Sequence, residues 1–233
     1  MSIGYLRELI RIRRQYSDWL LTVLTILICL MMFVVIPLQA TGVAFFQAFG
    51  LAELLVIIAC ALVISINPVA LAVLSIAFVT MVLVIALRSY WPLPHGLQIV
   101  AGCWLIIALT LAAVVARAVF RRGRVTYHRL MGAVLLYLLI ALAFVMLYAF
   151  VGLSFANAFS GLTFEFDPAL GSRLLYFSFI TLTSTGYGDI APIHPLARSL
   201  CSLEAVIGQL YPAILLARLV TLELLPQQTE RPK

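Results

Sequence analysis

Residues 181–189 read Thr-Leu-Thr-Ser-Thr-Gly-Tyr-Gly-Asp, and no other stretch of this 233-residue chain is so specific. Gly186 and Gly188 flank Tyr187, and glycine adopts backbone conformations that are closed to other residues. Successive carbonyl groups can therefore point the same way instead of alternating as in a strand. A row of carbonyl oxygens that faces an axis replaces the hydration shell of a potassium ion. The stretch thus predicts a cation pathway.

The composition around this stretch is that of a membrane protein. Hydrophobic residues make up 64% of the chain and charged residues 10%, whereas soluble domains have about 45–50% and about 25%. These values exclude a water-soluble enzyme, and they exclude a disordered chain, which needs low hydrophobicity and high charge. Each cysteine lies singly in an apolar run, so we expect buried thiols and no metal site. The four are Cys29, Cys60, Cys103 and Cys201.

Six apolar runs are long enough to cross a bilayer, because a helix needs about 20 residues to span roughly 30 Å of hydrocarbon. They cover residues 19–36, 46–66, 69–87, 97–118, 131–151 and 196–219. Pro37 is expected to end the first run, and Asn67-Pro68 to turn the chain between the second and third. The sequence predicts an all-α integral membrane protein with six transmembrane helices. A re-entrant pore helix and a filter loop are expected between the fifth and sixth.

Lysine and arginine gather in three segments that six spans place on one side of the membrane. The positive-inside rule makes that side cytoplasmic, so both termini of this multi-pass cell-membrane protein are expected inside. The Arg117–Arg124 cluster and the net charge of +6 stand beside apolar spans. Membrane lipids, with anionic headgroups at this cluster, are therefore the expected partner, and nucleic acid is not.

The chain divides into five predicted regions. They are a basic amphipathic N-terminal helix (1–18), a four-helix transmembrane region (19–118), a basic cytoplasmic linker (119–130), a pore region (131–221) and a short cytoplasmic tail (222–233). In the pore region, residues 172–183 can form a helix of roughly 18 Å, too short to cross and suited to dip in and stop. Gly171-Ser172 is the expected N-cap of this helix.

Residues 130–221 resemble the potassium channel pore family, whose filter reads Thr-Val-Gly-Tyr-Gly-Asp. Ser184 stands where the family usually has Thr and keeps the hydroxyl, whereas Thr185 replaces a Val whose side chain points away from the axis. Tyr187, which less selective relatives more often replace, is retained. Potassium selectivity is thus expected to survive both changes. The competing interpretation, a chance exposed turn between two helices, explains less of the surrounding pattern.

The resemblance implies a set of site residues. The ion-conducting filter is Ser184, Thr185, Gly186, Tyr187 and Gly188, with K+ held by the carbonyls of Ser184 to Tyr187 and by the Ser184 hydroxyl. Filter support is expected from Thr183, Asp189, Tyr176 and Phe177. The last two match an aromatic cuff around the filter tyrosine, and plain packing of the pore helix explains them about as well. One chain supplies one filter strand and the coordination of the ion needs four, so a homotetramer is implied.

Asp189 has two interpretations of similar weight. A ring of carboxylates would concentrate cations at the mouth of the pore, whereas the family's usual arrangement is a hydrogen bond behind the filter. Some bacterial relatives pair this Asp with a Glu of the pore helix, but Ile180 occupies that position here. The family pair is therefore missing.

Gly208 and Pro212 form the expected gating hinge of the last span. Gly208 matches the family's flexible glycine, and Pro212 removes a helical hydrogen bond. The alternative for Gly208 is a small residue that permits close helix packing. Two ionisable residues inside spans, Glu53 and Glu204, receive no assigned role.

The fourth span carries only one charge, Arg117, at its cytoplasmic end, so steep voltage dependence is not expected. The predicted function is passive, potassium-selective conduction without catalysis and without a cofactor, K+ being the permeant ion. The alternatives are a non-conducting or modulatory channel subunit and a less selective cation channel. An alternating-access transporter is disfavoured, because only one filter-like segment is present.

Overall fold

A computed structural model describes residues 19–41, 68–88, 95–120, 127–164 and 169–229 of the chain. Five helices in these ranges are long and apolar enough to cross a membrane: Trp19–Gln39, Pro68–Leu87, Gly96–Val119, Tyr127–Ser154 and Pro195–Arg218. They correspond to five of the six predicted spans. The predicted span at 46–66 and the predicted N-terminal helix at 1–18 lie outside the described residues. The total of six spans therefore stays a prediction.

The first span continues past Pro37, so the prediction that this proline ends the helix is wrong. The chain is helical from Trp19, passes through a π-helical turn, η1 (Met31–Val35), and continues as α2 (Ile36–Gln39). A proline lacks the N–H that an α-helix needs and crowds the preceding turn. The wider π turn directly before Pro37 is a common way to accommodate such a disruption.

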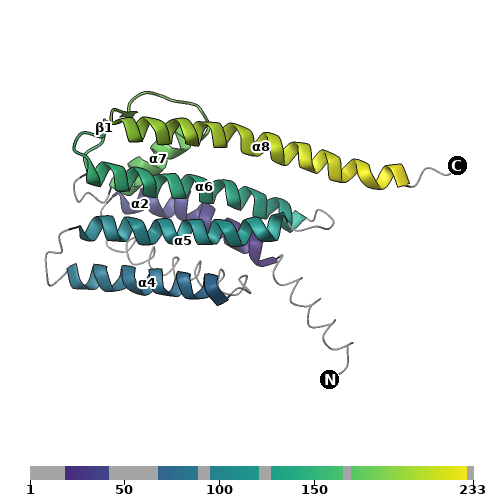
Figure 1. Cartoon of the computed structure of the whole chain (residues 1–233), viewed down its shortest axis with the longest axis horizontal. Helices are drawn as coiled ribbons and strands as arrows, with labels where there is room; N and C mark the ends of the chain where they lie inside the picture. Colours follow the sequence, from purple (N-terminus) through teal and green to yellow (C-terminus); the bar gives the residue numbers. More distant parts are fainter. Residues whose placement is uncertain (1–18, 42–67, 89–94, 121–126, 165–168, 230–233) are drawn as a thin grey trace, which may run out of the picture.

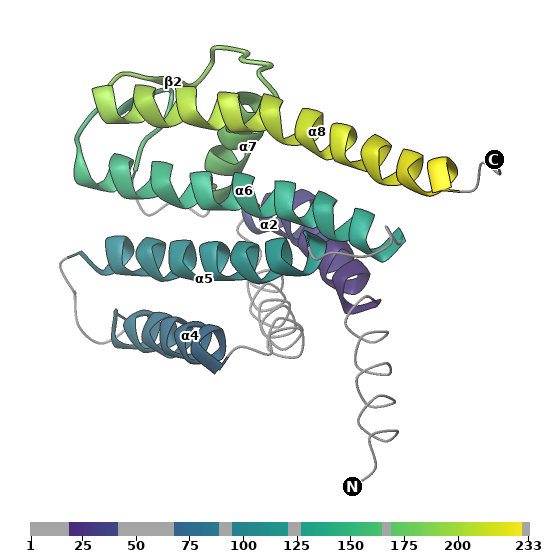
Figure 2. The same cartoon turned by 45° about the vertical axis from the view of Figure 1, so that its right-hand side comes forward.

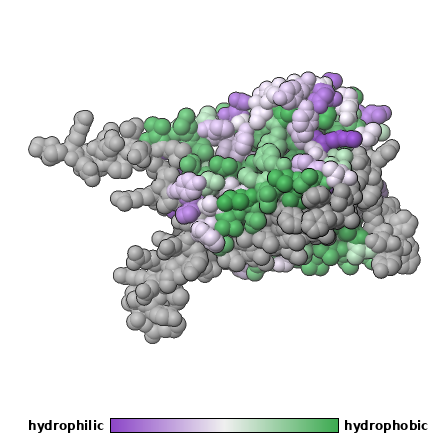
Figure 3. Space-filling view, turned by 180° about the vertical axis from the view of Figure 1, so that it is seen from behind, coloured by the Kyte–Doolittle hydropathy of each residue, from purple (hydrophilic) through white to green (hydrophobic). Residues whose placement is uncertain are grey.

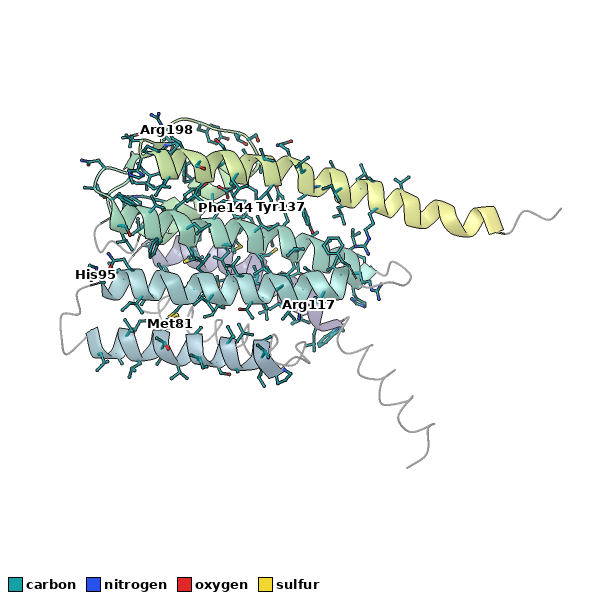
Figure 4. The ribbon with its side chains drawn as sticks, viewed as in Figure 1. Met81, His95, Arg117, Tyr137, Phe144 and Arg198 are labelled. Carbon is teal, nitrogen blue, oxygen red and sulfur yellow. The ribbon has the colours of Figure 1, made fainter. Side chains whose placement is uncertain are left out.

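The long helices α4 (Pro68–Arg88), α5 (Gly96–Val119), α6 (Tyr127–Ser154) and α8 (Pro195–Thr229) are stacked in order of sequence, whereas the first span, which contains α2, lies beside α6 (Figures 1 and 2). α4 packs on α5, and α5 packs on α6. α6 in turn contacts α7 (Leu170–Leu182) and α8. Met81 lies at the interface between α4 and α5, where it packs near Cys103 (Figure 4). α6 is apolar over most of its length and contacts neighbours on several sides, so it forms the centre of the core.

α7 is a short helix between α6 and α8, and its connections start and finish at one end of the bundle. After α6 the chain forms β1 (Phe159–Ser160), and after α7 it forms β2 (Ala191–Pro192), which leads into α8. The two strands pair antiparallel, with Phe159 opposite Pro192. This pairing brings the chain back to the end of α6 from which it departed.

α8 is longer than the predicted sixth span. Its backbone stays helical to Thr229, through most of the segment expected to be a tail. Seen from behind, hydrophilic residues gather over the upper part of the molecule and hydrophobic residues lie below them (Figure 3). The five long apolar helices are those of a multi-pass membrane protein.

Candidate functional site

The candidate site is built on the C-terminal end of α7. Leu174, Leu175, Phe177 and Ile180 are buried and anchor this helix in the core. The helix begins at Leu170 with Ala169 as its N-cap and no capping side chain, so the predicted cap at Gly171-Ser172 is wrong. Packing of the apolar face, rather than a cap, holds α7 in place.

The residues that follow α7 have an alternating backbone. The φ angle is positive at Ser184 (55°), Gly186 (56°) and Gly188 (85°), whereas neither Thr185 nor Tyr187 has a positive φ. Alternation between positive and non-positive φ lets successive peptide groups point the same way, so that N–H groups gather on one side, as in backbone nests, and carbonyl groups on the other. The two glycines adopt their positive φ at little cost, which is the freedom that the sequence predicts.

Carbonyl groups of α7 hold the amides of this segment. Ile180 O accepts hydrogen bonds from Thr185 N (2.8 Å) and Gly186 N (3.2 Å), and Thr181 O accepts one from Ser184 N (2.9 Å). The N–H groups are thereby turned toward the helix. The carbonyl groups of the same residues are left for other partners.

Side chains next to the segment form a small polar and aromatic support. The Thr183 and Thr185 hydroxyls lie 2.8 Å apart. Tyr176 donates a hydrogen bond to Asp189 Oδ1 (3.1 Å), and its ring stacks on Tyr187 at 6.3 Å between centroids with the planes 2° apart. Tyr176 therefore supplies Asp189 with a hydrogen bond from α7, although Ile180 stands at the position of the family's carboxylate. In this chain Asp189 has a hydrogen bond of its own, as in one of its two interpretations.

Phe177 does not join this support in the single chain. It is 3% exposed and packs on Tyr148 (5.0 Å between ring centroids) and Phe159 (5.6 Å). The two neighbouring aromatics point to different sides because adjacent helical residues differ in direction by about 100°. Within one chain Phe177 therefore packs in the core, as in the packing alternative, and its role in an aromatic cuff stays a prediction.

The outer end of the segment is braced by the strand pair. Gly161 has a φ of +76°, and a Cβ there would lie only 2.2 Å from Asp189 O. Ile193 N and His194 N both donate to Ala158 O, and the His194 ring stacks on Phe155. The outer loop and the exit of the segment are thus held against each other.

The inner end of the segment contacts α8. Gln209 Nε2 donates to Ser184 Oγ (3.1 Å). Gly208 is buried, and a Cβ at this position would lie 1.9 Å from Leu182 O. The backbone of α8 therefore touches the end of α7, as in the close-packing alternative for Gly208. α8 is one continuous helix through Pro212, and the expected hinge stays a prediction.

A buried polar cluster lies behind α7, and we define it as the Glu204 cluster: Glu204, Ser178, Tyr148 and the carbonyl of Ala141. All three side chains are 0% exposed. Tyr148 donates to Glu204 Oε2, Ser178 Oγ lies 2.5 Å from Glu204 Oε1, and the same hydroxyl lies 3.0 Å from Ala141 O. Ser178 and Tyr148 were not singled out from the sequence. The available signal was Glu204 itself, because an ionisable residue in a span needs polar partners on the helices around it.

Comparison with known families supports the resemblance seen in the sequence. Residues 134–223 match a family model described as "Ion channel". The matched region starts in α6, contains α7 and the alternating segment, and ends in α8. Comparisons with curated proteins and with solved structures gave no match.

Proposed function

We propose that this chain, whose residues 134–223 match an ion channel family model, conducts potassium ions passively through a homotetrameric pore. The ion path consists of the carbonyl groups of Ser184, Thr185, Gly186 and Tyr187 and the hydroxyl of Ser184. Gly188 completes the filter, and Thr183, Asp189 and Tyr176 support it from behind. No catalytic step and no organic cofactor belong to this function.

The alternating backbone of residues 184–188 carries the proposal. Positive φ at every second residue, with the amides of Ser184, Thr185 and Gly186 hydrogen-bonded to α7, supports a row of carbonyl oxygens on the opposite side. Such oxygens replace the hydration shell of K+. A chance turn between two helices needs neither the repeated alternation nor the bonds to Ile180 O.

The exposure of the filter in one chain supports assembly with further copies. Residues 183–189 are all exposed, and Tyr187 is 72% exposed although its neighbour Leu182 is fully buried. A single row of carbonyls solvates an ion from one side only. Four copies around an axis complete the coordination shell and cover these residues.

The charges of the helix ends support a cytoplasmic inner face and weak voltage dependence. Arg117 lies at one end of α5 and His95 at the other, and the filter segment is near the His95 end (Figure 4). The positive-inside rule makes the Arg117 end cytoplasmic. Voltage sensing needs several charges within the field, and α5 carries none apart from Arg117 in its last turn. Anionic lipid headgroups remain the proposed partner of the Arg117–Arg124 cluster.

The test compares potassium and sodium flux from liposomes that contain only the purified chain. Gly186→Ala places a Cβ in open space but at a φ of +56°, where an L-residue is strained by about 1–2 kcal/mol. We expect this strain to turn the carbonyl away from the axis and to abolish selective flux. Gly102→Ala is the matched control, since its Cβ also meets no atom within 4 Å and no positive φ is involved.

Three outcomes separate the proposal from its alternatives. Potassium flux with little sodium flux, lost in Gly186→Ala and kept in Gly102→Ala, supports a selective channel. Equal potassium and sodium flux indicates a less selective cation channel. Absence of flux from protein shown to be tetrameric, with or without a membrane potential, would favour a modulatory subunit.

A further inference from the structure

The carboxyl group of Glu204 lies where three helices meet. It lies on α8, contacts Tyr148 of α6 and Ser178 of α7, and is 0% exposed. An isolated ionised carboxylate in such a place loses its hydration, at a cost of several kcal/mol, unless a cation or enough hydrogen-bond donors compensate. Among the described residues, the hydrogen-bond partners of Glu204 are hydroxyl groups only.

The protonated form of Glu204 satisfies more hydrogen-bond contacts of the cluster than the ionised form does. Three short contacts are present: Tyr148 with Glu204, Glu204 with Ser178, and Ser178 with Ala141 O. Each contact needs one proton, but the two hydroxyls supply only two, and a backbone carbonyl supplies none. A third proton on the carboxyl group satisfies every contact, with Glu204 donating to Ser178 Oγ and Ser178 donating to Ala141 O.

We propose that Glu204 is held as a neutral carboxylic acid that ties the pore helix to the outer and inner helices, and that loss of this proton weakens conduction. The inference rests on the proposed channel function for its last part. Once Glu204 is ionised, the single hydroxyl proton of Ser178 can be donated either to the carboxylate or to Ala141 O, but not to both. The stronger acceptor is the charged group, so the bond between α7 and α6 is the one lost.

The position of the cluster connects it to the filter. Glu204 and Gly208 are one helical turn apart on α8, and they contact Ser178 and Leu182, which are one turn apart on α7. Between these two contacts lies Ile180, whose carbonyl holds the amides of Thr185 and Gly186. A shift of α7 at Ser178 is therefore passed to the filter backbone. Glu204 acts as a positioning residue and touches no ion.

The surroundings of Glu204 contain few other groups that titrate. From α6, Tyr148 and Tyr137 face it, and from α8 itself Cys201 lies near the Tyr148 hydroxyl. From α7 the facing group is Ser178, which does not titrate in this range. Phenols and thiols are neutral at neutral pH, so the described neighbours bring no charge that would favour the ionised form.

The first test is an infrared difference spectrum of the reconstituted full chain against Glu204→Gln. A neutral acid has a carbonyl stretch that a carboxylate lacks, so we expect this band in the wild type at neutral pH and its loss in the variant. Gln reproduces the neutral pattern, because its oxygen accepts from Tyr148 and its N–H donates to Ser178. Ser178→Ala is the second variant, and it should shift the acid band rather than remove it.

The second test is the pH profile of potassium flux and of thermal unfolding. In the wild type, we expect the potassium flux and the unfolding temperature to fall as the pH rises through the range where the acid band disappears. In Glu204→Gln, we expect both quantities to stay level over that range. Absence of the band at neutral pH, or identical pH profiles of wild type and Glu204→Gln, would overturn the inference. If the wild type passes no potassium at any pH, the channel function fails, while the band and the unfolding profile still decide the protonation of Glu204.

Discussion

Replacement of Gly208 by Ala separates the two roles considered for this glycine. A hinge needs conformational freedom in α8, whereas a packing role needs the absence of a side chain. A Cβ at Gly208 would lie 1.9 Å from Leu182 O and 2.8 Å from Leu182 C. Both atoms belong to the backbone of α7, so the clash cannot be relieved by turning a side chain.

The expected loss of stability follows from the size of this steric clash. Ordinary contacts of a Cβ begin at about 3.4 Å, so α8 would have to move away from α7 by about 1.5 Å at this point. Overpacking of this kind costs about 1–3 kcal/mol. The helix propensity of Ala offsets about 1 kcal/mol. Because Leu182 ends the helix that carries the filter, we also expect flux to fall.

The assay is thermal unfolding in detergent together with liposome flux, and Gly102→Ala is again the matched control. Both variants gain the same helix propensity, but at Gly102 the new Cβ meets nothing within 4 Å. The difference between them therefore reports the clash alone, and we expect Gly208→Ala to be less stable by about 1–3 kcal/mol. Equal stability of the two variants would refute the packing argument, and altered opening without a loss of stability would favour the hinge.

Two further predictions concern the neighbouring aromatics of α7. Tyr176→Phe keeps the ring stacked on Tyr187 but removes the hydrogen bond to Asp189, so we expect potassium flux to decline during sustained conduction while thermal unfolding stays unchanged; an unchanged time course of flux would contradict it. Phe177→Ala removes a ring that is 3% exposed and leaves a cavity beside Tyr148 and Phe159, so we expect a loss of about 3–5 kcal/mol in unfolding free energy. A loss below about 1 kcal/mol, measured in detergent, would show that the ring is not part of the core.

Most of the fold was predictable where the signal is local. A long apolar run predicts a span by its length and composition. For most helix ends, the bounds of the described spans agree with the predicted bounds within a few residues. Two helix ends that differ from the prediction can be explained. The helix passes Pro37 because a π turn absorbs the proline, and α7 starts before Ser172 because packing replaces the expected cap.

The site was predictable only in part. Two of the three positive φ angles in the alternating backbone follow from glycines, whereas the third, at Ser184, was not predicted; Tyr176, which donates to Asp189, was a candidate from the sequence. Phe177 stands next to it and had two interpretations, a cuff around the filter tyrosine and packing of the pore helix; in one chain it packs in the core. Which of two adjacent aromatics faces the filter depends on the rotation of α7, and a short apolar helix does not specify that rotation by its own pattern.

By itself, the sequence determined that this is a membrane protein with a glycine-dependent carbonyl segment, because hydropathy and the left-handed conformations of glycine are properties of single residues and their neighbours. Only the tertiary structure decided that Glu204 meets Ser178 and Tyr148, and that Gly208 touches Leu182. These contacts join α6, α7 and α8. Helices that are apolar on nearly every side can pack in several registers, and the register is selected by the fit of whole surfaces.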